Sequence, residues 1–570
     1  MAGARNRKAP VFSGSFTRYL RRLLWIGVLS LFSVWTGAEE LTEARDCIAV
    51  PEQADSDSFR FLPSPTHDEL AGNIPPGAVI RSIRIKRFKV FDLTDPKEDR
   101  WLYRWANDFH SVTRESVVRN HLLVEEGEHY NLPRLKESER ILRDLRFIYD
   151  ASVRPWRRCG EFVDLEVITR DIWTFIPMIS FTRSGGANDY GIGFRDTNLL
   201  GTGKQVMIRH ESDEERSGNT LVYADPMLLG TRWRLRLSLT DNDDGYDRGL
   251  RLARPFFSIY ESWSAGGALE QQLLEDKVWF RGDEVAEFEH QRDQVKLFGG
   301  IASDTTPGRQ VGRWRCGYNY ETHDFDYSDS DIPPPELPDD RDYSYPYLGY
   351  QSIEDEFTTV TNLDYLGRTE DLYVGEQYEW SLGWSDENLG ATRDQLVFQG
   401  SYGNTLRLSP RDWWVLNSWI SGFWAVDEEE FENLWATIES RYHVRQAEKW
   451  TLFARLRLDY TDGLTLDNQL TLGGSNGLRG YDRHYQTGDR AFVFNLEQRY
   501  YSDWHPLRLV RVGAAAFLDV GRAWFEDRDN GPNGGVLANV GVGLRFNSSR
   551  AEKSSVIHID LAYPLVKLSL

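Results

Sequence analysis

The segment VRVGAAAFLDVG, residues 510–521, alternates between two kinds of side chain over its whole length. One face carries Val510, Val512, Ala514, Ala516, Leu518 and Val520, and the other carries Arg511, Gly513, Phe517 and Asp519. Alternation with a period of two indicates a β-strand whose two faces meet different surroundings. The same pattern recurs at residues 452–460, 492–496 and 538–546. We therefore expect the C-terminal part of the chain to be all-β.

Helical periodicity is absent from the whole region around this segment, from about residue 177 onward. A soluble β-sandwich also alternates, but its water-facing side is commonly rich in Lys, Thr and Glu. Here the polar faces carry Gly, Arg, Asp and Asn, and the apolar faces are unbroken. Mean hydropathy is −0.52, yet aromatic residues reach 13% with 20 tryptophans. These features favour a transmembrane antiparallel β-barrel with aromatic girdles over a sandwich.

Charge and cysteine content narrow the classes of function. A formal charge of −21 argues against a nucleic-acid partner, because binding of nucleic acid requires a basic patch on the protein. The three cysteines, Cys47, Cys159 and Cys316, form no C-x-x-C motif, so a zinc or redox motif is not indicated. Cys47 and Cys159 either pair in an oxidising compartment or remain thiols, and the sequence leaves both readings open.

The N-terminus has the layout of an export signal. Basic residues precede an apolar core at residues 23–35, and small residues at 36–38 offer a cleavage site. That core is shorter than the roughly 20 residues of a membrane-spanning helix. We predict a signal peptide over residues 1–38 and an irregular lead-in over residues 39–78.

A compact mixed domain is predicted over residues 79–172. A strand over 79–90 precedes helices over 114–124 and 131–145, the second capped by Asn131 with Pro133 in its first turn. Strands over 151–156 and 162–168 complete a β-α-α-β-β order. The barrel is then expected over residues 176–570.

The most distinctive motif is LGGSNGLRGY at residues 472–481, followed by NLEQR at 495–499 and FLDVG at 517–521. Together they resemble the outer-membrane assembly and translocation barrels of the BamA/TamA type, the bacterial surface antigen family. In that family an external loop folds back into the barrel, with a tip motif that matches Leu478, Arg479, Gly480 and Tyr481. The resemblance implies that Arg479 is held by one acidic residue in each of the next two strands, here Glu497 and Asp519.

The alternation of the two strands supports this assignment independently. Glu497 and Asp519 both fall on the polar, lumen side of their strands. A buried arginine needs a carboxylate partner, and a guanidinium can bridge two carboxylates. We predict that Arg479 pins a plug or gate. The G-x-S-x-G match at residues 473–477 lacks the helix that a hydrolase needs. We therefore expect no catalytic residue, no metal and no cofactor.

Further stretches extend the resemblance to residues 79–565. Residues 193–203 and 223–226 resemble the early barrel, and 79–172 resembles a single polypeptide-transport-associated (POTRA) domain. The family barrel has about sixteen strands, with five after the loop, whereas we find four runs: 491–501, 510–521, 537–546 and 556–565. Before the loop we count 11 to 15 runs. We therefore expect the closing strand to be missing, by C-terminal truncation rather than by unusual closure.

The resemblance implies a non-enzymatic protein of the bacterial outer membrane, with residues 39–172 in the periplasm. It would insert or translocate client polypeptides, or lipid, under control of the Arg479 loop. Expected partners are outer-membrane lipid, outer-membrane or secreted client proteins bound by strand addition to the periplasmic domain, and periplasmic accessory proteins. The alternatives are a two-partner secretion transporter, usually with two POTRA domains and a plug helix, a passive pore or surface adhesin, and a lipid-modifying barrel enzyme.

Overall fold

The computed structural model describes residues 47–49, 74–184, 187–303, 310–363, 366, 369–526, 534–551 and 556–566. The chain divides after residue 46, and the description below concerns residues 47–570. The predicted signal peptide at 1–38 lies outside the described residues, as does the lead-in at 39–78 apart from its short segments 47–49 and 74–78.

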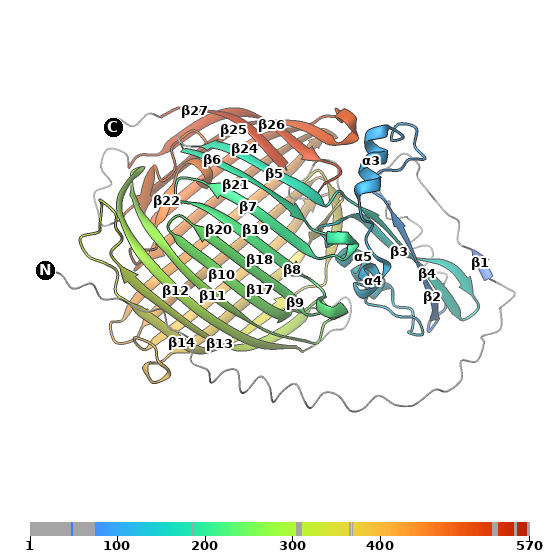
Figure 1. The fold of residues 1–570 in the computed structure, drawn as a ribbon, viewed down its shortest axis with the longest axis horizontal. Helices are drawn as coiled ribbons and strands as arrows, with labels where there is room; N and C mark the ends of the chain where they lie inside the picture. Colours follow the sequence, from blue (N-terminus) through green and yellow to red (C-terminus); the bar gives the residue numbers. More distant parts are fainter. Residues whose placement is uncertain are drawn as a thin grey trace. The chain divides into compact units, whose positions relative to one another are not determined.

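An N-terminal α/β domain precedes the barrel (Figure 1). Its four-stranded sheet has the order β1-β3-β4-β2, in which β2 runs parallel to β4 and the other pairs are antiparallel. Two of its elements, β1 and α3, are absent from the sequence-based prediction. The elements are β1 Cys47–Ala49, β2 Val79–Phe88, α3 Trp101–Phe109, α4 Glu115–Asn120, α5 Leu132–Asp144, β3 Ile148–Cys159 and β4 Phe162–Asp171.

Helices α4 and α5 pack on the sheet through a common apolar core. The core includes Leu135 and Leu142 from α5 and Val153 and Leu165 from the sheet, all fully buried. The Asn131 side chain accepts a hydrogen bond from the Arg134 backbone N–H at 3.1 Å, and Pro133 lies in the first turn, so helix α5 begins as predicted.

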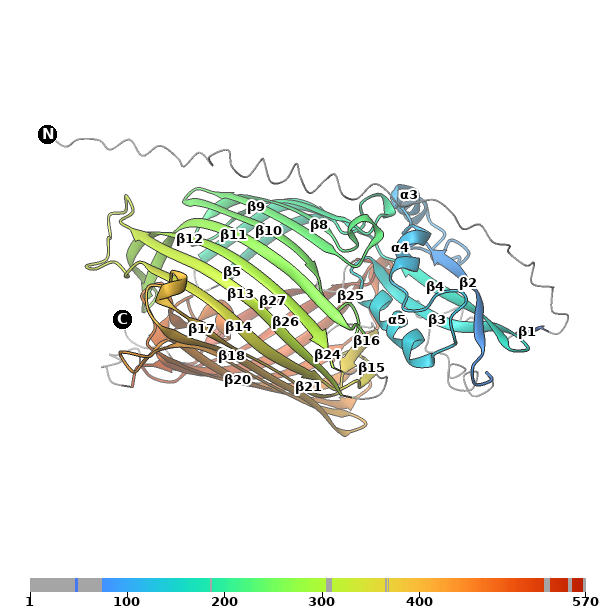
Figure 2. The same cartoon turned by 90° about the horizontal axis from the view of Figure 1, so that it is seen from below.

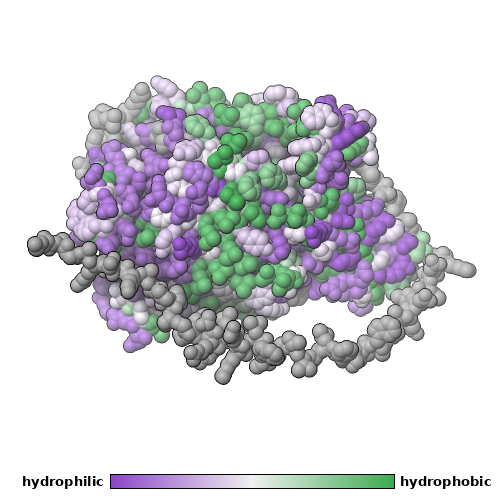
Figure 3. Space-filling model, in the orientation of Figure 1, coloured by the Kyte–Doolittle hydropathy of each residue, from purple (hydrophilic) through white to green (hydrophobic). Residues whose placement is uncertain are grey.

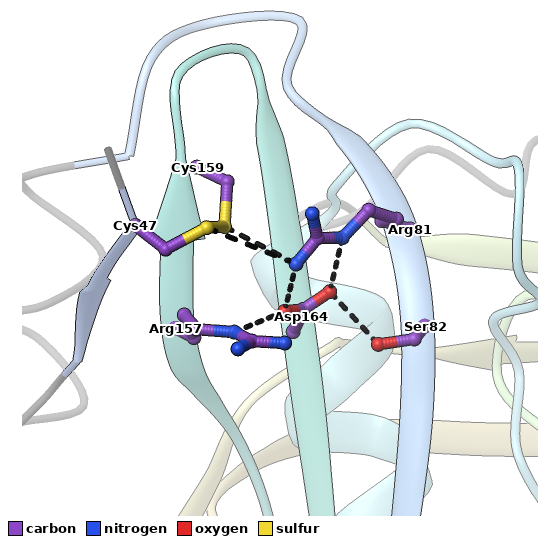
Figure 4. The surroundings of a disulfide bond; sticks show 6 residues. All are labelled: Cys47, Arg81, Ser82, Arg157, Cys159 and Asp164. Atoms are coloured by element: carbon purple, nitrogen blue, oxygen red, sulfur yellow. Dashed lines mark hydrogen bonds and ion pairs between the residues drawn. A yellow bond between two sulfur atoms is a disulfide. The ribbon is translucent and has the colours of Figure 1, made fainter. Parts of the chain in front are cut away.

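A disulfide between Cys47 and Cys159 fastens β1 to the end of β3, which settles the question left open by the sequence (Figure 4). Beside it, Arg81 and Arg157 both bind the fully buried carboxylate of Asp164. Burial opposes ionisation of Asp164, but hydrogen bonds from Arg81, Arg157 and Ser82 outweigh it and lower its pKa to about 2.

Nineteen strands form a closed barrel in which neighbours along the chain pair antiparallel (Figure 1). The antiparallel barrel class is thereby confirmed, with nineteen strands rather than about sixteen. The strands are β5 Phe175–Ser184, β6 Ala187–Asp196, β7 Gln205–Ser212, β8 Ser217–Asp225, β9 Arg234–Asn242, β10 Gly245–Arg254, β11 Trp263–Phe280, β12 Asp283–Ala302, β13 Val311–Asp326, β14 Arg341–Ile353, β17 Gly375–Ser385, β18 Gln395–Ser409, β19 Asp412–Ala425, β20 Glu430–Ala447, β21 Trp450–Asp462, β24 Arg490–Tyr501, β25 Val510–Trp524, β26 Leu537–Ser548 and β27 Val556–Pro564.

Closure of the barrel differs from the expectation of a missing strand. Four barrel strands follow the loop that carries Arg479, as predicted, and fifteen precede it, where the sequence left 11 to 15 open, but β27 lies directly beside β5. Because strand directions alternate and the number is odd, β5 and β27 run in the same direction. The four strands after the loop are therefore enough to close the barrel, because the last of them, β27, lies beside the first strand, β5.

The outer surface of the barrel carries an apolar band, visible as the green zone between hydrophilic ends in Figure 3. Its most exposed side chains include Ile179 (82%), Leu561 (76%) and Phe181 (73%). Exposed apolar side chains at this density mark a surface made for lipid rather than water. None of the helices among the described residues is long and apolar enough to cross a membrane.

Turns at one end of the barrel contact the α/β domain. The Tyr103 hydroxyl donates to the Leu507 carbonyl at 2.6 Å, and Arg550 binds Glu98 at 2.5 Å. A hairpin between β14 and β17, made of β15 Phe357–Thr361 and β16 Thr369–Tyr373, lies beside α5 (Figure 2). There Arg143 binds Asp371 through two bonds of 2.9 and 2.7 Å. We call this end the domain end and the opposite end the loop end.

A loop lock in the barrel lumen

Residues 463–489, between β21 and β24, form a long loop that folds into the barrel. It carries a short hairpin, β22 Leu470–Leu472 and β23 Gln486–Gly488. Apolar side chains of the loop, among them Leu472 and Leu478, are buried against Val493 and Ala523 of the barrel wall. The loop is therefore a packed element of the lumen rather than a solvated surface loop.

Glycines at two positions allow the loop to take this path. Gly473 has φ of +152°, and a Cβ there would lie 2.0 Å from the Asp482 carbonyl oxygen. A Cβ on Gly480 would lie 2.7 Å from the Asn539 Cβ and 3.4 Å from the Pro564 nitrogen. Gly480 therefore lets the loop tip approach β26 and β27 more closely than any residue with a side chain could.

Arg479 lies at the centre of a carboxylate cluster. Its Nε and Nη2 donate to both oxygens of Asp519 at 2.9 and 2.7 Å, and Nη1 donates to Glu497 at 2.8 Å. Nη1 also reaches Asp560 on β27 at 3.3 Å. The guanidinium stacks over the Phe517 ring at 3.5 Å from its centroid. One arginine thus joins the loop to β24, β25 and β27.

Neighbouring polar side chains complete the cluster. Asp519 is fully buried, and its two oxygens also accept from the amides of Asn495 and Asn539, each at 2.8 Å. Glu497 accepts from Arg499 at 2.9 Å, and Arg545 binds Asp560. Since the carboxylates are bonded from several sides, they are held in place whether or not the loop moves.

The other motif residues anchor the loop tip. The Leu478 side chain is fully buried in the loop's apolar cluster. The Tyr481 hydroxyl lies 2.8 Å from the Ala538 carbonyl and 2.9 Å from that of Val566. We name Leu478, Arg479, Gly480 and Tyr481 with Glu497, Asp519 and Asp560 the loop lock.

Other loop residues contact two further parts of the barrel wall, β6 and β11. Arg483 binds Asp189 of β6, and the His484 ring stacks on Trp279 of β11 at 4.5 Å. Gln469 exchanges hydrogen bonds with the Trp279 backbone at 2.8 and 3.2 Å. Because β11 and β25 lie on different sides of the barrel, the loop spans the lumen and is fixed to both walls.

Sequence reasoning named Arg479, Glu497 and Asp519, and the structure places all three in contact. It missed Asp560, Phe517, Asn495, Asn539 and Arg545. Phe517, Asn495 and Asn539 share a face with the named acids by alternation, so the same pattern could have found them. Asp560 also lies on the polar face of its predicted strand, opposite Ile557, Ile559 and Leu561, so alternation places it in the lumen as well.

One part of the chain is similar to a known protein family. Residues 358–546, which include the loop and its partners on β24 and β25, match the family model described as haemolysin secretion/activation protein ShlB/FhaC/HecB. This is a secretion family, the class that the sequence analysis kept as its alternative. No curated protein matches the chain.

Several solved structures are similar to the chain at low sequence identity. CdiB from Escherichia coli is 11% identical, with 91% of this chain and 76% of that chain covered and a TM-score of 0.43. CdiB from Acinetobacter baumannii is 14% identical, with 85% and 74% covered and a TM-score of 0.38. BamA from Haemophilus ducreyi lacking POTRA domains 1–3 is 13% identical, with 85% and 81% covered and a TM-score of 0.36.

Proposed function

We propose that this chain is a non-enzymatic transporter of the bacterial outer membrane that passes client polypeptides through its barrel. The loop 463–489 is its gate, and the loop lock holds the gate closed. The observation that carries this proposal is the loop itself, which spans the lumen and is bonded to opposite walls. A passive pore would leave the lumen open to solutes, so a bonded obstruction favours gated transport.

The closed state depends on one cation among carboxylates. When Arg479 moves away, Glu497 keeps Arg499 as its partner. Asp519 keeps Asn495 and Asn539, so the barrel wall stays intact when the loop moves. Moving a guanidinium out of such a site is costly, on the order of 3–5 kcal/mol if it goes unpaired. Opening therefore requires a compensating interaction, which a client bound in the lumen would provide.

A secreted polypeptide is the client that we favour. The matching family model is a secretion family, and the matched region contains the gate and two of the strands that hold it. Assembly of outer-membrane proteins is the second candidate, and the motif at residues 478–481, which resembles the BamA/TamA type, supports it.

The α/β domain would receive the client at the edge of β2. The edge of β3 is already occupied. Ala151 and Val153 donate their backbone N–H groups to the side chains of Asp150 and Glu139. Pro155 has no backbone N–H to donate, and residues 157–159 pair with β1. On β2, the Ile83 backbone N–H is bonded by the Glu126 side chain, so the edge is covered at that residue. We propose residues 84–88, which follow it at the end of the strand, as the segment for strand addition.

The test is site-specific photo-crosslinking in cells. A crosslinker at Phe88, which is 42% exposed at the end of β2, should trap a client, whereas one at Arg158 on the capped edge should not. Recovery of one secreted protein supports export, and recovery of nascent outer-membrane proteins supports assembly. Equal yields at both positions would reject β2 as the docking edge, and no client at any position of the domain would reject transport.

A further inference from the structure

Two histidines of neighbouring strands face each other near the loop end of the barrel. His290 of β12 and His323 of β13 stack with ring centroids 5.1 Å apart, and the His290 Nε2 lies 2.9 Å from the His323 Nδ1. Their side chains are only 12% and 11% exposed. This pair belongs neither to the loop lock nor to the sequence-based prediction, which expected no metal ligand.

A carboxylate fixes the outer nitrogen of each ring. The His290 Nδ1 lies 2.6 Å from Asp276, and the His323 Nε2 lies 3.2 Å from Glu321. Since an ionised carboxylate only accepts hydrogen bonds, the His290 Nδ1 carries the proton, and the negative charge of Glu321 favours a proton on the His323 Nε2. A neutral imidazole has one N–H, so the two inner nitrogens then present lone pairs to each other at 2.9 Å. A cation between them would satisfy both lone pairs.

The loop supplies a third donor at the same place. A carboxylate oxygen of Asp467 lies within 4.8 Å of both histidine ligand atoms. The Asp467 Oδ2 is bonded to Arg341 and Asn468, but the buried Oδ1 has no hydrogen-bond partner among the described residues. A shared proton between the histidines would leave that oxygen unpaired, whereas a metal ion would satisfy all three groups.

We propose that His290, His323 and Asp467 bind a transition-metal ion of the zinc type. Two imidazoles and one carboxylate are ligands that zinc takes, at about 2.0–2.2 Å. Asp276 and Glu321 orient the two rings, as outer-shell carboxylates do in metal sites. Glu321 is itself held by Arg292 at 2.6 Å. Because Asp467 belongs to the gate loop, the ion joins the root of that loop to β12 and β13.

Zinc binding by the full-length protein in detergent tests the site. Cys316 is an exposed free thiol, so every protein carries Cys316→Ser to remove a competing ligand. Titration with Zn²⁺ alone should give one bound ion per chain. His290→Gln or His323→Gln should abolish that stoichiometric binding, and Asp276→Asn should weaken it about 10–100-fold. The matched control His210→Gln, which alters a histidine bonded to Asn219 elsewhere in the barrel, should bind like the parent.

The gate loop gives a second readout. Zn²⁺ should slow hydrogen exchange over residues 463–472 in the parent protein and not in Asp467→Asn. Heat-modifiable migration on gels confirms that each variant retains its barrel. Absence of stoichiometric zinc in the parent, which would mean that the histidines share only a proton, overturns the proposal. So does zinc binding that survives both histidine variants.

An independent observation concerns helix α3. Trp101, Trp105 and Phe109 recur every four residues and are 78%, 50% and 69% exposed. The opposite face of α3 is buried through Tyr103 and Ala106, and Leu509 of the β24–β25 turn packs against it. That turn exposes Trp504 (64%) and Leu507 (57%). An aromatic stripe of this kind is too costly to leave in water.

We infer that this stripe docks on the periplasmic leaflet of the membrane around the barrel. It is joined to a barrel turn by the Tyr103–Leu507 bond, and aromatic residues favour the membrane interface. A dye on Phe109→Cys, in the Cys316→Ser protein reconstituted in phospholipid vesicles, should be quenched by headgroup-level spin-labelled lipid. The same dye on Arg104→Cys should be quenched by aqueous iodide. Equal iodide quenching at both positions would overturn the inference.

Discussion

At the scale of single residues, the proposed gate depends on the charge cluster around Arg479. A bidentate bond to Asp519 and a further bond to Glu497 use most of the donors of the guanidinium. The cluster is inside the barrel, where an unpaired charge is costly. A single substitution should therefore change the state of the gate without changing the fold of the wall.

Arg479→Ala should open the gate. Loss of the guanidinium removes its charged hydrogen bonds, on the order of 1.5–3 kcal/mol of loop docking, while the carboxylates retain their other partners. We expect larger single-channel conductance in planar bilayers and normal heat-modifiable migration on gels. Arg522→Ala, which alters another β25 arginine that contacts Trp524, is the matched control and should leave conductance unchanged. Parental conductance in Arg479→Ala would remove the lock from the mechanism.

The disulfide should stabilise the α/β domain. It joins residues 112 apart, and closing a loop of that length contributes about 2–5 kcal/mol by restricting the unfolded chain. Cys47→Ser should therefore lower the denaturant concentration at which half of the domain is unfolded in the full-length protein, whereas Cys316→Ser should not. Limited proteolysis at increasing denaturant concentration measures this midpoint. Equal midpoints would mean that β1 adds no stability.

His121 makes the packing of the α/β domain against the barrel sensitive to acid. Burial lowers its pKa to about 4, its Nδ1–H donates to the Val117 carbonyl at 2.7 Å, and its ring lies 5.8 Å from that of Phe257 in a domain-end turn. An unfolded histidine titrates near 6.5, so the unfolded state binds the proton first and stability falls from pH 6.5 toward 4. The loss should reach about 2 kcal/mol by pH 5.

Hydrogen exchange of α4 in the full-length protein measures this effect. The protection factor of α4, which corrects for the slower intrinsic exchange at low pH, should fall about 10–30-fold between pH 7 and pH 5. His121→Gln should remove that fall, although it lowers stability at pH 7. A parental protein whose α4 protection is independent of pH would contradict the burial of a neutral His121.

At the scale of elements, the hairpin β15–β16 holds the α/β domain against the barrel. Arg143 of α5 is buried with Asp371 of β16 as its bidentate partner. Asp371→Asn should weaken this contact by about 1–3 kcal/mol, because the arginine loses the charge of its bidentate partner and retains Glu139 and the Ala151 carbonyl. We expect faster hydrogen exchange across α5 and not across α4. The control Asp412→Asn, in a turn that bonds only Ser409, should leave α5 unchanged.

Local patterns predicted most elements of the fold. The Asn131 cap and Pro133 fix the start of α5, and alternation fixes the four strands after the gate loop to within a few residues. Helix α3 was missed because its exposed stripe of Trp101, Trp105 and Phe109 does not resemble a soluble amphipathic helix. Strand β1 was missed because three residues carry no periodicity; only the disulfide places them.

The lock was predictable because its residues are close in sequence and share faces of adjacent strands. The group of His290, His323 and Asp467 was not, since its members come from two strands and a loop that only the closed barrel brings together. The number of strands could likewise not be predicted from local patterns, because closure of a barrel depends on all of its strands together.

For the whole molecule, an odd strand number sets where the chain leaves the barrel. Strand β27 begins at the domain end and finishes at the loop end, so Leu565 should face the cell exterior. A cysteine at Leu565 in the Cys316→Ser protein should react with a membrane-impermeant maleimide on intact cells. Asp503→Cys, in an exposed domain-end turn, should react only after the outer membrane is permeabilised. The reverse labelling would contradict the nineteen-strand order.

The shared direction of β5 and β27 has a consequence for cargo carried by the chain itself. A barrel with an even number of strands returns its polypeptide to the compartment from which it came, so both flanking segments serve the same side. With nineteen strands the polypeptide makes one net passage through the bilayer. Any passenger sequence fused behind β27 would be displayed on the cell surface, covalently continuous with a domain that samples the periplasm.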